Sequence, residues 1–155
     1  MMIESREVNG KPTNSEGTGH AEAKEVPMKK PAAEYVTLVE VLELTATYEE
    51  FEAAIKAVAR RLESEGVREL VSFNFYGEPG SVEVGAILTF SDRERMTEHM
   101  GMISSWKEFE RFFAVVKPLD VRVYGRLSEE AKAWIGQFGD IVSRKFEHHM
   151  AGFVR

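Results

Sequence analysis

Two groups of side chains in this sequence have the chemistry and the spacing that a small-molecule site could use. His99 lies among Met96, Met100 and Ile103 at intervals of three and four residues, which predicts one face of a helix. A histidine, an amide, phenols and a guanidinium can take or orient a hydroxyl proton and stabilise the anion that forms. Side chains of these kinds also alternate along two predicted strands, as Ser72, Asn74 and Tyr76 on one and Arg122 and Tyr124 on the other. The catalytic residues that we predict are His99, Asn74, Tyr76, Arg122 and Tyr124.

Each group also has a structural explanation, which the sequence leaves open. A histidine among methionines is often a packed, hydrogen-bonded core residue. Polar residues that alternate along a strand often line a hydrated sheet face. Trp106 and Trp134 occupy helical positions and are expected to anchor the core.

We expect no metal and no cofactor. The adjacent His148 and His149 would point to opposite faces of a strand, or about 100 degrees apart on a helix, and neither arrangement suits joint chelation. The sequence has no cysteine, so thiolate sites and disulfides are excluded. It also lacks a Walker motif, a GxGxxG loop, an HExxH motif and a nucleophile elbow.

The composition predicts one domain with a substantial core. Of the 155 residues, 43% are hydrophobic and ten are phenylalanine. A net charge of −6 without a basic cluster argues against nucleic acid as a partner. No apolar run approaches the roughly 20 residues of a membrane span, and no signal core begins the chain. We therefore expect a cytoplasmic protein with neither nucleic-acid nor membrane partners.

Hydrophobic periodicity places the elements that must position these side chains. Strands are predicted at 35–44, 67–76, 81–90 and 119–127. Thr47 and Glu50 form a capping box for a helix that ends at Gly66. A second helix is predicted to begin at a cap near Asp92 and to break near 104–106. It restarts at a second capping box, Ser105 and Glu108, and Pro118 stops it. A last helix is predicted from Ser128 to Gly139.

This order is βαββαβ with a C-terminal helix, which predicts an α+β, ferredoxin-like fold with a four-stranded antiparallel sheet. We expect a disordered N-terminal tail over 1–33, the ferredoxin-like domain over 34–127, and a C-terminal helix and arm of the same domain over 128–155. The end of that arm is either a short strand or extended chain. His20 lies in the tail and is expected to have no role.

The first strand predicts a homodimer. Both of its faces are mainly apolar, and one layer of helices covers only one of them. A second sheet packed across a two-fold axis would form a dimeric α/β barrel and cover the other face. The alternative is that the C-terminal segment folds over the open face of its own sheet.

One stretch of the sequence resembles the antibiotic biosynthesis monooxygenase-like domain of the dimeric α/β-barrel superfamily. The resemblance rests on the end of a strand followed by Asp92, on His99 seven residues later, on a helix break, and on a strand that reads VRVYG. The resemblance covers about residues 34–127. It implies cofactor-independent oxygenation of a quinol- or anthrone-like aromatic as the leading function. It also leaves open a non-catalytic small-molecule-binding or stress-associated protein, and haem binding through His99. The chain departs from the haem-degrading branch because its first strand, VTLVEVLEL, has no Asn.

Overall fold

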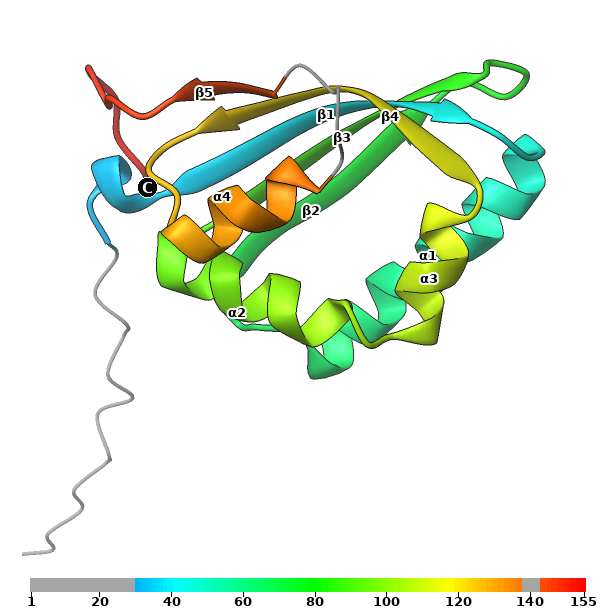
Figure 1. The fold of residues 1–155 in the computed structure, drawn as a ribbon, viewed down its shortest axis with the longest axis horizontal. Coiled ribbons are helices and arrows are strands. Elements are labelled where there is room, and N and C mark those ends of the chain that lie inside the picture. Colours follow the sequence, from blue (N-terminus) through cyan, green and yellow to red (C-terminus); the bar gives the residue numbers. More distant parts are fainter. Residues whose placement is uncertain (1–29, 138–142) are drawn as a thin grey trace, which may run out of the picture.

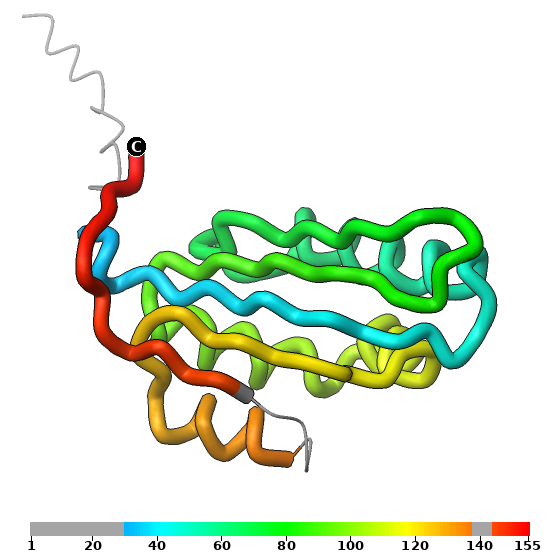
Figure 2. Tube along the Cα trace, turned by 90° about the horizontal axis from the view of Figure 1, so that it is seen from above, coloured from blue at the N-terminus to red at the C-terminus, as the bar shows by residue number. Residues whose placement is uncertain are grey.

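The fold is built on one twisted sheet, seen from its open side in Figure 2. A computed structural model describes residues 30–137 and 143–155. The order of the strands in the sheet is β2-β3-β1-β4-β5. Their bounds are β1 Val36–Leu44, β2 Leu70–Gly77, β3 Glu83–Phe90, β4 Val116–Tyr124 and β5 Ser143–Phe146.

Within residues 30–137 and 143–155, four helices lie on one face of this sheet and none lies on the other (Figure 1). They are α1 Tyr48–Glu65, α2 Arg93–Ile103, α3 Lys107–Phe113 and α4 Glu129–Gly136, and a short 3-10 turn, Ala32–Glu34, precedes β1. No helix in the described ranges is long and apolar enough to cross a membrane.

The predicted α+β, ferredoxin-like fold is confirmed, but the sheet has a fifth strand. The first four strands pair antiparallel in the predicted arrangement. β5 then pairs with β4 in parallel, so the sheet is mixed and not purely antiparallel. β5 therefore extends the sheet at the edge of β4, and the residues that follow it turn past the start of β1 (Figure 2).

The local signals for α1 and for the break between α2 and α3 are confirmed. Thr47 accepts a hydrogen bond from the amide of Glu50, whose carboxylate accepts from the amide of Thr47. The second predicted capping box does not form. Trp106 occupies the N-cap of α3, and the Ser105 hydroxyl donates to the carbonyl of Met102 in the preceding turn instead.

Pro118 lies inside β4 and is not the residue that stops α3. The helix ends at Phe113, and β4 begins at Val116, earlier than the sequence pattern predicts. The register with β1 shifts at Pro118, where β4 has one additional residue. A proline donates no ladder hydrogen bond and is tolerated at such a bulge. The bulge leaves Leu119 41% exposed, although the pattern predicts it on one face with Val121.

The core fills the space between the helices and the covered face of the sheet. One cluster surrounds Phe90 and Met96, and the other surrounds Leu42 and Phe112. At the N-terminal end of the described chain, Lys30 forms an ion pair with Asp92, the N-cap of α2. Of the predicted disordered tail, residues 30–33 are ordered, and Ala32 and Ala33 begin the 3-10 turn. Residues 1–29, with His20, and the predicted helix end at Gly139 lie outside the described residues.

Candidate active site

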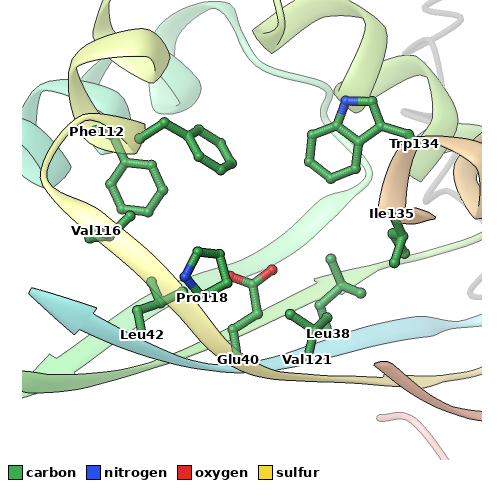
Figure 3. Close-up of a pocket in the computed structure, with 10 residues that line it drawn as sticks. Leu38, Glu40, Leu42, Phe112, Val116, Pro118, Val121, Trp134 and Ile135 are labelled. Carbon is green, nitrogen blue, oxygen red and sulfur yellow. The ribbon is translucent and has the colours of Figure 1, made fainter. Parts of the chain in front are cut away.

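Glu40 is the one charged residue on the helix-covered face of β1. Its neighbours on that face are Leu38 and Leu42, which are 4% and 2% exposed. Figure 3 shows its carboxylate pointing away from the sheet, between the aromatic side chains of Phe112 and Trp134. A carboxylate is therefore held inside an otherwise apolar layer of the fold.

Two small cavities meet at Glu40. The β4 cavity, of about 40 Å³, is bounded by β1, β4, α3 and α4, and its lining includes Phe112, Pro118 and Trp134. The His99 cavity, of about 50 Å³, lies between the sheet and the helices, and its lining includes His99, Phe73 and Ile55. Glu40 and Trp134 line both cavities. Glu40 keeps part of its surface accessible to a water-sized probe, as its place in the lining of both cavities requires.

Removal from water raises the pKa of Glu40 from 4.5 to about 7. Desolvation is the cause, and no cation among the described residues offsets it. Near neutral pH the carboxyl group is therefore present in both its protonated and its ionised form. A group with this pKa can both take and return a proton at neutral pH, as general acid–base catalysis requires.

His99 lies on α2 and faces the same side of the sheet as Glu40. Its side chain is 3% exposed, and its ring centroid lies 5.0 Å from that of Phe90. Nδ1 has no hydrogen-bond partner in the described part of the chain. Burial lowers the pKa of His99 to about 4, so the imidazole is neutral at physiological pH.

The other four predicted site residues lie on the opposite face of the sheet. Side chains alternate along a strand, and those of Asn74, Tyr76, Arg122 and Tyr124 fall on the face that carries no helices. Asn74 and Arg122 occupy one row of the sheet, with β3 and β1 between them. Three strand spacings separate them by about 14 Å. The structure therefore does not bring His99 and these four residues together within one chain.

Three of the predicted site residues on the open face have local partners. Asn74 donates to the hydroxyl of Ser72 at 3.4 Å. Arg122 donates to Asp120 at 3.0 Å, and this contact raises the pKa of the guanidinium. The Tyr124 ring stacks on Phe146 with a centroid distance of 5.0 Å. Within one chain, this face has the properties of a solvated sheet surface.

The sequence signal that could have found Glu40 is a gap in the apolar pattern of β1. Leu38 and Leu42 flank it at positions i−2 and i+2, so a single carboxylate falls on the buried stripe of the strand. Charged residues are almost never placed there without a partner or a function. By contrast, no group of three or more potential metal ligands is found among the described residues.

Comparison with known proteins places this arrangement in a structural group. No protein-family model matches the sequence, and no curated protein matches it either. The fold is similar to the crystal structure of MupZ from Pseudomonas fluorescens, with a TM-score of 0.56 and 16% identity over 79% of this chain and 95% of that chain. It is also similar to SnoaB, described as a cofactor-independent oxygenase from Streptomyces nogalater, with a TM-score of 0.52 and 13% identity over 62% of this chain and 96% of that chain.

The chain has a ferredoxin-like fold similar to the folds of MupZ and SnoaB. The resemblance predicted from the sequence is thus confirmed at the level of the fold. Identities of 13% and 16% do not carry activities from one protein to another, and one fold hosts many functions.

Proposed function

We propose that this protein is a monooxygenase-like enzyme that oxygenates a small phenol- or quinol-like aromatic without a cofactor. The observation that carries the proposal is Glu40, whose carboxylate points into an aromatic-lined space and has a pKa of about 7. The cofactor-independent oxygenase SnoaB has a similar fold, which adds support.

The proposed chemistry begins with proton transfer. The ionised form of Glu40 takes the hydroxyl proton of the bound phenol, and the electron-rich anion adds O2 at a ring carbon that bears a hydrogen. The O–O bond then breaks, so that one oxygen atom stays on this carbon as a quinone carbonyl and the other leaves as water with the two hydrogens that the substrate loses. The substrate supplies all four electrons. The apolar walls formed by Phe112 and Trp134 exclude water and strengthen electrostatic interactions inside the site. His99 lies on the same side of the sheet, where its neutral imidazole offers a hydrogen-bonding group.

The substrate must widen the cavity as it binds. Volumes of about 40 and 50 Å³ suit water molecules, whereas ligand pockets usually measure about 300 Å³ or more. Trp134 and Phe113 are only partly buried and line both cavities, so we infer that these side chains move to admit an aromatic ring.

We also propose that the protein is a homodimer that pairs through the open sheet face. Ile87 near the centre of this face is 41% exposed, and Tyr124 and Phe146 at its edge are 41% and 48% exposed. No helix covers them, and β5 lies beside β4 and not across the face (Figure 2). In such a dimer Asn74, Tyr76, Arg122 and Tyr124 would lie at or near the interface, and their catalytic role stays a prediction.

Oxygen uptake tests the enzymatic proposal. We would measure uptake by the purified protein with a panel of hydroquinones and anthrones, in the presence of a chelator. Saturable uptake is expected, and Glu40→Gln should lower kcat/KM by about 10² to 10⁴ because it removes the proton acceptor. Glu43→Gln, on the opposite face of β1, is the matched control and should retain the activity.

Other outcomes would support the alternative functions. Binding of the same aromatics without turnover would favour a non-catalytic binding protein and contradict the proposal. A Soret band that appears on adding hemin and is lost in His99→Ala would favour haem binding. That result would require α2 to move, because His99 is 3% exposed.

A further inference from the structure

Trp134 lies at the boundary between the two cavities that meet at Glu40. Both cavities are lined by Leu38 and Glu40 of β1, which form a shared floor. Both are also lined by Phe112 and Phe113 of α3 and by Trp134 of α4. Figure 3 shows Phe112 and Trp134 on opposite sides of the Glu40 carboxylate. Aromatic side chains from two helices therefore divide one space above β1 into two parts.

The packing of α4 holds the indole of Trp134 at this boundary. Ala131 and Ile135 are buried in the core, so the face of α4 that they form is turned toward the sheet. Trp134 is only partly buried and packs against the same core cluster, at the margin of that face. At the N-terminus of α4, the hydroxyl groups of Ser128 and of Thr97 on α2 hydrogen-bond at 2.5 Å. The indole is thus positioned by a helix that is anchored both to the core and to α2.

The size of the two cavities limits what can bind beside this indole. They measure about 40 and 50 Å³, whereas a cavity of roughly 150 Å³ is known to bind benzene. A single ring can therefore enter one of them only when the neighbouring side chains move aside. Two fused rings would extend across the boundary and would need the volume that the indole occupies. Displacing an aromatic side chain from the core forfeits the free energy of its burial.

We propose that Trp134 determines the specificity of the site at Glu40, because its indole excludes ligands with two or more fused rings and restricts the site to single-ring phenols and hydroquinones. The inference names the substrate class of the same site and so rests on the proposed function. Within the panel proposed above, hydroquinones and not anthrones are the expected substrates.

Equilibrium binding under nitrogen tests the inference without turnover. We would measure Kd by calorimetry for phenol and for 1-naphthol, in the wild type and in Trp134→Ala. The ratio of the 1-naphthol Kd to the phenol Kd should fall by at least about tenfold in Trp134→Ala, because the second ring can then be buried where the indole was. Ile135→Ala is the matched control. Ile135 is on the same helix but lines only the β4 cavity, so its truncation leaves the boundary in place and the ratio nearly unchanged.

Three results would overturn the inference. They are an unchanged ratio in Trp134→Ala, an equal fall in Ile135→Ala, and a failure of Trp134→Ala to bind 1-naphthol. If Trp134→Ala does not fold, Trp134→Leu takes its place, since it also removes both rings of the indole. Binding with the expected selectivity but without oxygen uptake would contradict the proposed function and leave the role of Trp134 standing. Oxygen uptake by the wild type with an unchanged ratio in the variant would do the reverse.

Discussion

The two faces of the sheet have opposite chemical character. The helix-covered face is almost entirely apolar and holds Glu40, with a pKa of about 7. The open face carries more polar groups, including Asn74 and Arg122, and these are hydrogen-bonded to neighbours on their own strands. The comparison teaches that the number of polar residues does not locate a reactive site. One carboxylate in apolar surroundings has a shifted pKa because it is desolvated. Polar groups on a solvated strand hydrogen-bond to water and to one another and do not mark a reactive site by their number.

The largest expected effect on stability comes from the aromatic cluster on the covered face. Phe112 is 5% exposed and packs edge-on against Phe75 at 5.6 Å. Phe112→Ala should lower the free energy of unfolding by about 3 to 5 kcal/mol, measured by urea denaturation. Phe146→Ala, on the open face, is the comparison and should cost less than about 1 kcal/mol. Equal losses would contradict the difference between the faces.

The next effect is a pH dependence of stability that belongs to Glu40. Its folded pKa of about 7 lies above the ordinary 4.5, so the folded protein holds this proton more tightly than the unfolded chain does. The associated stability is present below pH 4.5 and is lost as the pH rises through 7. From pH 4 to pH 8 the wild type should lose about 3 kcal/mol of unfolding free energy that Glu40→Gln does not lose, because the variant has no carboxyl group to ionise at this position.

Urea denaturation across this pH range would measure the shift. Glu43→Gln, on the open face of the same strand, should follow the wild type. A constant difference between Glu40→Gln and the wild type would show that the carboxyl group of Glu40 is not desolvated.

A charge on the open face should act on association more than on folding. Ile87→Glu places a carboxylate in the centre of the proposed dimer interface, and sedimentation should then show a monomer. We expect the affinity of the dimer to fall by at least about 2 kcal/mol, since an unpaired charge would be buried there. Ala53→Glu on the exposed surface of α1 controls for the added charge. A wild-type protein that is already monomeric would contradict the dimer.

The smallest effect is expected for the ion pair of the open face. Arg122 and Asp120 are partly solvated, with side chains 44% and 31% exposed. Arg122→Ala should change the stability of the folded chain by less than about 0.5 kcal/mol, measured by thermal or urea unfolding. A loss of oxygen uptake in this variant, with stability unchanged, would instead show that the open face takes part in catalysis.

Local features of the fold could be predicted well from the sequence because their causes are local. Thr47 with Glu50 and Ser128 with the amide of Ala131 form the caps that their residue types predict. The break between α2 and α3 follows from the weak helix interior near Gly101 and 104–106. The end of α3 and the start of β4 were predicted less well, because the bulge at Pro118 depends on pairing with β1.

The candidate site was predicted only in part. The chemistry of His99 and its place on the apolar face of a helix were visible in the sequence, and so, in principle, was the gap in the apolar stripe of β1 at Glu40. The sequence could not show that His99 lies across the sheet from Asn74, Tyr76, Arg122 and Tyr124. Alternation defines two faces of a strand, but which face a helix from elsewhere in the chain will cover depends on long-range packing.

The sequence by itself therefore determined the helices, the first four strands, their order and the ferredoxin-like arrangement, since periodicity and caps act over a few residues. Tertiary structure alone decided that β5 joins β4 in parallel and that Glu40 and His99 share one cavity. It also decided the pKa of Glu40. Desolvation is produced by side chains that arrive from β4, α3 and α4, and no stretch of the sequence contains them together.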